Sequence, residues 1–232
     1  MSTEQYAVVA RASSARGEVV LRRRFDADAP EDSPSVLELR VNGVFVMDDR
    51  ETHSEVLLAR EALASAPRVE SVLVGGLGLG FTAHEVLADP RVRRLVVAEL
   101  EPALVGWFRD GTIPHGREFL ADGRVHVAEA DVRQVLEEAT PASYDVVLLD
   151  VDNGPGFLVH EENAALYDAP FLEVVRDRLR PGGELVVWSC DPAPGLADAL
   201  TATFGGCTRV PIRVDLQGRE QEYFLLRGCR QP

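Results

Sequence analysis

Lysine is absent from this sequence of 232 residues, because all 24 of its basic residues are arginine. This absence excludes enzymes that form a Schiff base on lysine, NTPases with a Walker-type P-loop, and protein kinases, since each of these needs a lysine ammonium group. The 38 acidic residues give a formal net charge of −14. So acidic a chain is a poor non-specific ligand for nucleic acid and for anionic membranes, and we expect neither partner. Its charge attracts cations, including small amines.

Cysteine is also scarce. Cys190, Cys207 and Cys229 lie far apart, without a C-x-x-C pair or histidines at zinc-finger spacing. We therefore expect free thiols in a reducing compartment and no metal site. No uncharged apolar run approaches the roughly 20 residues needed to span a bilayer, and residues 1–10 lack the apolar core of a signal peptide. These features predict a cytoplasmic protein.

The first 50 or so residues favour short β-strands. Val36–Val41 and Val44–Met47 flank Asn42-Gly43, a dipeptide typical of a type I′ hairpin turn. Glu18–Phe25 is a further β-rich run, and the acidic segment Asp26–Ser35, with its two prolines, is expected to be a solvated loop. We assign residues 1–53 to a small N-terminal β region.

From Ser71 onward, short apolar runs alternate with helical segments, a texture typical of an α/β fold whose parallel sheet is covered on both faces. Strands are expected at 71–74, 95–99, 125–129, 145–150 and 184–188. Helices are expected at 54–64, 81–87, 103–110, 132–139, 164–179 and 195–204. The runs 208–214 and 223–227 suit an antiparallel C-terminal hairpin. Residues 54–232 are therefore predicted to form a Rossmann-like, methyltransferase-type catalytic domain.

Polar residues occur where the predicted parallel strands end, which is where ligands bind in open α/β sheets. The first strand runs into Gly75–Gly80, the second ends at Glu99, the third leads to Asp131 and the fourth ends at Asp150. A glycine-rich turn lets a ligand approach the backbone. An acid about 20 positions later can accept hydrogen bonds from both hydroxyls of a ribose. Asp131 can accept one from an adenine amine.

Structural interpretations of these residues remain open. The glycines can be explained simply as a tight strand–helix connection with no ligand. Glu99 and Asp131 can likewise be explained as solvated loop acids. A nicotinamide dinucleotide is an alternative ligand, although the glycine spacing departs from the G-x-G-x-x-G pattern that binds its pyrophosphate. A structural role for Asp150 is harder to justify, because a carboxylate beside an apolar strand is costly without a partner.

From about Val36 onward, the chain resembles the spermidine-synthase family of polyamine aminopropyltransferases. The stretches that carry the resemblance are 49–55, 75–80, 99–102, 131, 150–155 and 166–183. The resemblance implies a class I S-adenosylmethionine-dependent fold, with Asp150 as the catalytic carboxylate. It also implies that S-adenosylmethionine or its decarboxylated form is the donor, bound by Gly75, Gly76, Leu77, Gly78, Gly80, Glu99, Leu100 and Asp131.

The chain departs from this family at several positions. Gly78 stands where the family carries an aspartate that binds the amine of the decarboxylated donor, so the intact donor is no longer repelled there. His53 replaces a tyrosine near the acceptor, and Asp152 lies one residue before the family's second loop carboxylate, where Asn153 stands. We expect His53, Asp152, Asn153 and Tyr167 to bind the acceptor, although Tyr167 is equally well explained as a core aromatic.

The leading prediction is a spermidine-synthase-like transferase that moves an aminopropyl group to a small amine. The alternatives are an S-adenosylmethionine-dependent methyltransferase and a non-catalytic nucleoside-binding paralogue. The N-terminal strands offer edges that can pair between two copies of the chain, which predicts a homodimer. His160 can reach the acceptor pocket from its entrance, although an exposed or core-capping position is the favoured interpretation.

Overall fold

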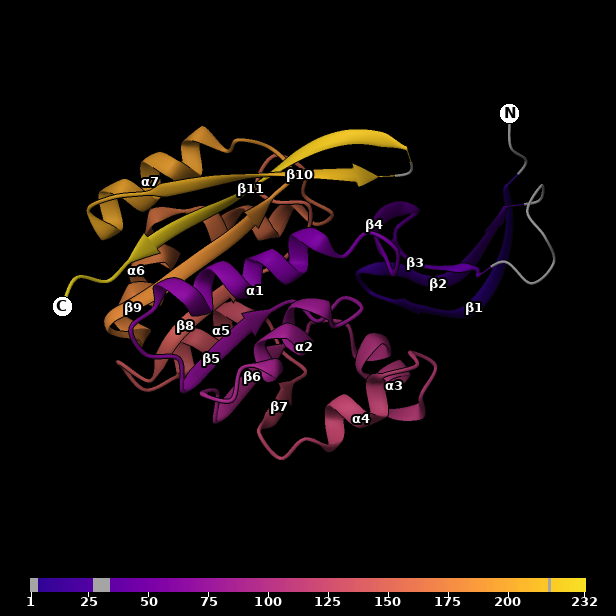
Figure 1. Ribbon diagram of the computed structural model, residues 1–232, viewed down its shortest axis with the longest axis horizontal. Coiled ribbons are helices and arrows are strands. Elements are labelled where there is room, and N and C mark those ends of the chain that lie inside the picture. Colours follow the sequence, from indigo (N-terminus) through magenta and orange to yellow (C-terminus); the bar gives the residue numbers. More distant parts are fainter. Residues whose placement is uncertain (1–3, 27–33, 217) are drawn as a thin grey trace.

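The computed structural model describes residues 4–26, 34–216 and 218–232. These residues form two β-sheets, and Figure 1 shows the smaller, N-terminal sheet at one end of the molecule, beyond the larger sheet. Most of the predicted loop Asp26–Ser35 lies outside the described residues.

The N-terminal sheet is an antiparallel meander in the order β1-β2-β3-β4. Asn42 and Gly43 have φ values of 51° and 78°, and their turn joins strands that pair Val41 with Val44, so the predicted hairpin is confirmed. The first strand was not predicted, because its alanines and serines have a low intrinsic preference for β-structure; pairing with the second strand forms it. The strands are β1 (Glu4–Ser14), β2 (Gly17–Asp26), β3 (Val36–Val41) and β4 (Val44–Asp48).

The larger sheet has seven strands in the order β10-β11-β9-β8-β5-β6-β7. Its strands are β5 (Ser71–Gly75), β6 (Arg94–Ala98), β7 (Val125–Ala128), β8 (Tyr144–Leu149), β9 (Leu179–Ser189), β10 (Thr208–Leu216) and β11 (Arg219–Cys229). The five strands from β7 to β9 are parallel, whereas β11 runs antiparallel to both β9 and β10. The predicted α/β fold, mostly parallel with an antiparallel C-terminal hairpin, is therefore confirmed.

Helices cover both faces of the larger sheet, as alternate residues of each strand point to opposite cores. They are α1 (His53–Ser65), α2 (Phe81–Ala88), α3 (Pro102–Asp110), α4 (Gly116–Ala121), α5 (Val132–Glu138), α6 (Ala169–Arg178) and α7 (Pro194–Phe204). One core packs α1 to α4 and continues into the N-terminal sheet through Leu21 and Leu39, while the other packs α5, α6 and α7. The shared core fixes the N-terminal sheet beside the larger one.

One helix prediction was wrong, and one helix was missed. The predicted helix Ala164–Leu179 is instead a 3-10 helix, η1 (Glu161–Tyr167), followed by α6. The break falls at Asp168, whose backbone is extended and which precedes the first residue of α6. Pro170 has no backbone N–H to continue a helix from η1, and it suits the first turn of a new helix. Helix α4 was not expected, since six residues beginning with a glycine give no periodic signal.

Candidate active site

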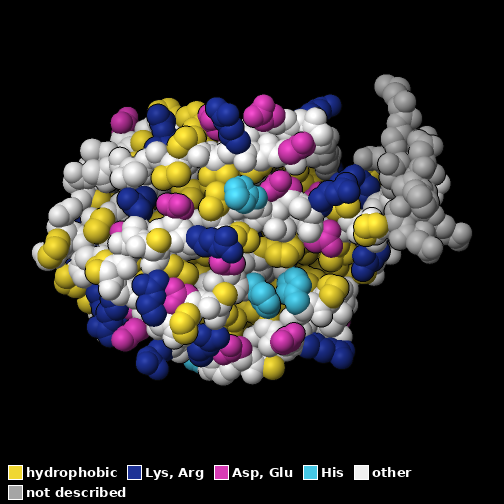
Figure 2. All heavy atoms as spheres, in the orientation of Figure 1, with side chains coloured by type: hydrophobic (Ala, Val, Ile, Leu, Met, Phe, Trp, Pro, Cys, Tyr) yellow, Lys and Arg dark blue, Asp and Glu magenta, His cyan; other side chains and the backbone are white. Residues whose placement is uncertain are grey.

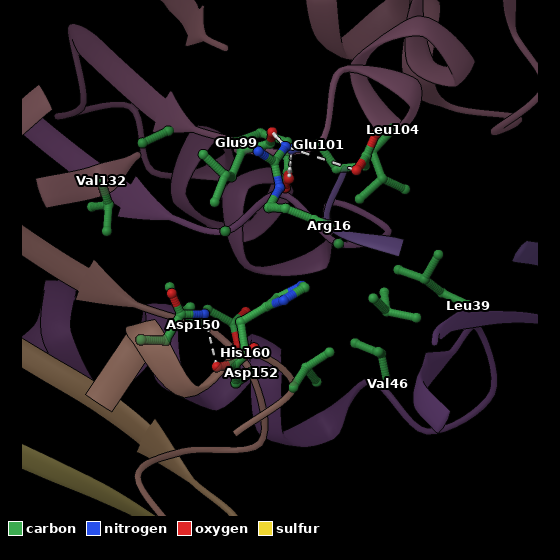
Figure 3. A pocket seen from close by; sticks show the side chains of 18 of the residues that line it. Arg16, Leu39, Val46, Glu99, Glu101, Leu104, Val132, Asp150, Asp152 and His160 are labelled. Carbon is green, nitrogen blue, oxygen red and sulfur yellow. Dashed lines mark hydrogen bonds and ion pairs between the residues drawn. The ribbon is translucent and has the colours of Figure 1, made fainter. Parts of the chain in front are cut away.

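A cavity opens where the carboxyl ends of β5, β6, β8 and β9 face the N-terminal sheet (Figure 3). About 1170 Å³ of it is not filled by protein atoms, part of this being open to solvent. Its walls come from the two sheets, the loops that follow the parallel strands and helix α1. The lining residues that bear charge are Arg16, Glu55, Glu99, Glu101, Asp131, Asp150 and Asp152, with His160 beside them.

The glycine-rich turn after β5 allows neighbouring segments to approach its backbone closely. Gly76 has a φ of 96°, and a Cβ atom there would collide with the carbonyl oxygen of Asp150. The Gly76 N–H donates to the Ala98 carbonyl at 2.9 Å, and the Leu77 N–H donates to the Glu99 carboxylate at 2.9 Å. Only glycine fits at position 76, and the turn is thereby held against the ends of both neighbouring strands.

Glu99 lies just past β6 and is held in one orientation. Its Oε2 accepts from the Leu77 N–H and its Oε1 from the Glu101 N–H, at 2.9 and 2.7 Å. Burial raises the pKa of Glu99, and the two N–H donors act in the opposite direction. Each carboxylate oxygen has two acceptor sites, so both can still accept from a ligand hydroxyl.

Asp131 caps α5, where its Oδ1 accepts from the Arg133 N–H at 2.8 Å. It lines the cavity together with Val132, and Leu100 and Leu104 line it as well. Apolar side chains with a carboxylate beside them suit a flat base that bears an amine. Figure 3 shows Glu99 and Leu104 along one side of the cavity and Asp150 on the facing side.

Asp150 follows the last residue of β8, where its backbone N–H donates to the Gly75 carbonyl at 2.9 Å. The Thr82 hydroxyl, from α2, donates to Asp150 Oδ2 at 2.6 Å. The surrounding protein withdraws this carboxyl from water and raises its pKa to about 6, although the Thr82 bond acts against the shift. A raised pKa in a cavity marks a candidate acid–base group.

The loop after β8 carries the other predicted acceptor residues. Asp152 and Asn153 line the cavity, and Asp152 Oδ2 accepts from Asn163 Nδ2 at 2.8 Å. Burial raises the pKa of Asp152, while Asn163 and the charge of His160 oppose the rise. The His160 ring projects into the cavity (Figure 3), which favours the pocket-entrance interpretation over the exposed or core-capping one.

Two of the predicted acceptor residues are not in the wall of the cavity. His53 begins α1 and is exposed, because the inward face of this helix starts one residue later, at Ser54. The Tyr167 ring is buried in the second core, and its hydroxyl donates to the Val151 carbonyl at 2.9 Å. Neither side chain lines the cavity in this structure, and their roles in acceptor binding stay predictions. Tyr167 holds the loop after β8 from behind.

Three of the residues predicted to bind the donor from the glycine run also lie outside the wall, whereas Gly76 and Gly78 line it. Gly75 ends β5 against the Val132 side chain, and the Leu77 side chain is buried in the first core. Gly80 precedes α2 in a left-handed conformation, with a φ of 88°, against Phe108. These three shape the turn rather than face the cavity.

Among the wall residues that sequence reasoning missed are Arg16, Glu55 and Trp188. Arg16, from the β1–β2 turn, donates to the Leu100 carbonyl and lies 3.8 Å from the Glu101 carboxylate. Trp188, the residue before the last of β9, lines the cavity. Glu55 lies on the buried face of α1, and a charged residue between apolar inward positions was the signal that could have found it.

Burial also changes the acidity of Glu55. Removal of its carboxyl from water raises the pKa to about 7, and the negative charge of Asp150 adds to the rise. The Ser54 hydroxyl, which donates to Glu55 Oε2 at 2.7 Å, opposes it. The cavity therefore holds two neighbouring carboxyls that bind protons more tightly than ordinary acidic side chains.

The described residues contain no group of three or more His, Cys, Asp and Glu side chains that could hold a metal ion. They also contain no helix that is long and apolar enough to cross a membrane. Figure 2 shows arginine and acidic side chains interspersed on one face of the molecule. The three cysteines are free, and the cytoplasmic location stays a prediction.

The family model of the spermine/spermidine synthase domain matches residues 51–194, more than half of the chain. The chain belongs to the spermine/spermidine synthase family. The match begins just before α1 and ends at the start of α7, so it includes Glu55, the glycine turn and Asp150. The family prediction made from the motifs is confirmed.

Relatives of two kinds are similar to this family member. Polyamine aminopropyltransferase 2 of Pseudomonas aeruginosa is 34% identical over 159 residues, which cover 64% of this chain and 43% of that protein. Putrescine N-methyltransferase 3 of Nicotiana tabacum is 30% identical over 123 residues, which cover 52% of this chain and 30% of that protein. The chain thus spans less than half the length of these curated relatives.

Solved spermidine synthases share the fold. The structure of the Thermotoga maritima enzyme superposes with a TM-score of 0.74 at 16% identity, covering 96% of this chain and 72% of that one. A spermidine synthase in complex with the transition-state analogue AdoDATO gives a TM-score of 0.73 at 15% identity, covering 96% of this chain and 73% of that one. The likeness includes the N-terminal sheet, because nearly the whole chain is covered.

Proposed function

We propose that this chain transfers an aminopropyl group from decarboxylated S-adenosylmethionine to a small amine. The observation that carries the proposal is the place of Asp150, a carboxylate with a raised pKa in a cavity whose other end suits a nucleoside. Membership of the spermine/spermidine synthase family and the names of the aminopropyltransferase relatives support it.

The nucleoside end of the cavity would hold the donor. Glu99 would accept hydrogen bonds from the ribose hydroxyls, and Asp131 would accept one from the exocyclic amine of adenine. Leu100 and Leu104 would pack against the base. These assignments fit the residues present, because a fixed carboxylate, a second carboxylate and apolar side chains line one continuous space.

The chain's task in the reaction is to align the amine and to take up a proton. The sulfonium of the donor supplies an activated carbon with a good leaving group, so alignment by the cavity walls provides much of the remaining acceleration. An amine with a pKa near 10 must lose a proton before it attacks. Asp150 would accept that proton at Oδ1, since Thr82 already donates to Oδ2. Its pKa of about 6 leaves it ionised at neutral pH yet more basic than an ordinary aspartate.

Methyl transfer from intact S-adenosylmethionine is the second candidate. Gly78 has no side chain, so no carboxylate at that position selects the amine of the decarboxylated donor or repels the carboxylate of the intact one. The putrescine N-methyltransferases among the relatives favour the same alternative.

Calorimetry of both donors with nucleoside-free protein separates these candidates. A tenfold preference for the decarboxylated donor, about 1.4 kcal/mol, supports aminopropyl transfer. The opposite preference supports methyl transfer. Nucleoside binding without turnover of any amine supports the non-catalytic alternative, and binding of neither donor contradicts the proposed site.

We also propose that two copies of the chain pair through β1. This strand is the edge of the N-terminal sheet, and it exposes Tyr6, Val8 and Val9, with Val8 56% exposed. Long apolar edge strands favour pairing with another chain. Sedimentation should give a dimer for the parent protein and a monomer for Val8→Lys; a monomeric parent protein would contradict this pairing.

A further inference from the structure

Glu55 is a charged side chain on a helix face that is otherwise built for the core. The face consists of Ser54, Glu55, Leu58, Ala59, Ala62 and Leu63. Glu55 is only 8% exposed, and what remains accessible borders the cavity rather than the outer surface. Its carboxyl therefore faces the same space as that of Asp150.

Hydroxyl groups rather than cations accompany this pair of carboxyls. Ser54 Oγ donates to Glu55 Oε2 at 2.7 Å, and Thr82 Oγ1 donates to Asp150 Oδ2 at 2.6 Å. Thr82 Oγ1 also lies 3.5 Å from the Glu55 carbonyl oxygen, so it links the two segments. Within residues 4–26, 34–216 and 218–232, neither carboxylate forms an ion pair with an arginine or histidine.

Glu55 is buried and Asp150 half-buried, and without a nearby cation the two carboxylates are costly when both are ionised. The protein avoids this state by keeping a proton on the pair: the pKa is about 7 for Glu55 and about 6 for Asp150. Near neutral pH, Glu55 is therefore the more fully protonated of the two groups, and the negative charge of Asp150 contributes to this. A cation placed between them removes the reason for keeping that proton.

We propose that Glu55 is the second anionic group of the acceptor subsite, where it and Asp150 hold an ammonium group of the acceptor and Glu55 releases its proton as that ammonium binds. This role rests on the proposed alkyl transfer, for which Glu55 would help to select the acceptor. In this binding step, the Glu55 carboxyl becomes a carboxylate, one proton leaves to solvent, and the ammonium keeps its own protons. No covalent bond changes.

The same arrangement selects amines over alcohols. An ammonium group compensates both carboxylates, whereas a neutral hydroxyl leaves them repelling one another. During transfer, one amine proton passes to Asp150 and the neutral amine attacks the donor carbon. The nitrogen then carries the positive charge that the sulfonium loses, and ionised Glu55 stabilises it beside the newly formed bond.

Calorimetry of putrescine binding at pH 7, in buffers of different ionisation enthalpy, tests the proposal. Putrescine stays cationic at this pH because its amines have pKa values near 10, so any proton released comes from the protein. We expect the parent protein to release roughly half a proton per bound putrescine, as a group with a pKa of about 7 requires. Putrescine affinity should rise with pH through this range.

Two variants and one control complete the test. Glu55→Gln should lose the proton release and bind putrescine at least tenfold more weakly, while Glu55→Asp should retain part of the release. Glu51→Gln is the matched control, because Glu51 adds negative charge in the same segment but is not part of the cavity wall; it should release protons as the parent does. Circular dichroism checks that each variant folds.

The role of Glu55 would be overturned if Glu55→Gln released as many protons and bound putrescine as tightly as the parent protein. Failure of the parent protein to bind putrescine at all would also overturn it. Donor binding and product formation are measured separately, so the alkyl transfer can stand while this inference fails.

Discussion

The sulfur atom of Met47 stands where a side chain at position 78 would begin. A Cβ atom on Gly78 would lie 2.6 Å from Met47 Sδ, and the same sulfur lies 3.2 Å from the Leu79 backbone nitrogen. Met47 belongs to β4, so a residue of the N-terminal sheet fills a place at the glycine turn of the larger sheet. Gly78 is therefore matched to Met47, and the absence of an acid at position 78 is a packing feature of this chain.

Replacing Gly78 by Asp should destabilise the protein by roughly 1–3 kcal/mol, because the new side chain meets Met47 and Gly78 has a φ of 51°. The double variant Met47→Ala/Gly78→Asp should recover part of that loss and bind the decarboxylated donor better than the intact one. Thermal unfolding measures the loss and recovery of stability, and donor calorimetry measures the donor preference, with Met47→Ala as the control. A fully stable Gly78→Asp variant would contradict the packing argument.

Replacing Asp150 by Asn should lower turnover by roughly 10²–10⁴-fold if Asp150 is the general base. The Thr82 hydrogen bond can persist on the amide oxygen, so donor affinity should stay close to that of the parent protein. Parent turnover should rise as the pH increases through about 6, where Asp150 ionises, and the variant should lack this rise. Turnover in the variant equal to that of the parent removes the assignment.

Stability should depend on pH through Glu55. Its folded-state pKa of about 7 exceeds the ordinary value of 4.5, so the folded protein binds more protons than the unfolded chain between these values. Stability from this group is therefore complete below about pH 4.5 and is lost as the pH rises through 7, by an amount on the order of 3 kcal/mol. Denaturant unfolding of Glu55→Gln should show a flatter pH dependence and greater stability than the parent at pH 8. An unchanged slope would mean that Glu55 is not a buried acid.

Arg16 joins the N-terminal sheet to the nucleoside end of the cavity. It donates to the Leu100 carbonyl, and Ser14 Oγ donates to Glu101 Oε2 at 3.1 Å. Arg16→Ala should weaken the binding of 5′-methylthioadenosine by about threefold to tenfold, because the turn over the base is no longer held. Stability should change by less than about 1 kcal/mol, since the ion pair with Glu101 is partly exposed. Arg11→Ala, in the neighbouring exposed pair with Glu18, is the control. Equal affinity in the Arg16 and Arg11 variants would contradict this role.

The residues that could be predicted are those fixed by local pattern and sheet topology. Glycines after an apolar strand predict a tight turn, and acids at the ends of parallel strands must meet at one edge of the sheet. Gly76, Glu99, Asp131 and Asp150 lie in one cavity for this reason. The alternation of strands and helices specified the fold equally well.

The rest of the site depends on tertiary placement. Arg16 reaches the cavity only because the N-terminal sheet packs on the α1 side of the larger sheet, and no sequence pattern encodes that docking. His53 and Glu55 lie two residues apart in one helix turn, so its rotation about the axis decides which of them faces inward. Asp168 ends a predicted helix because Pro170 restarts it.

The most direct test of the account is one reaction: purified protein, decarboxylated S-adenosylmethionine and putrescine, with 5′-methylthioadenosine and the alkylated amine quantified by mass spectrometry. We predict stoichiometric formation of both products by the parent protein and at least a hundredfold slower formation by Asp150→Asn. Products formed at equal rates by the two proteins, or no product from either despite measurable donor binding, would contradict the account.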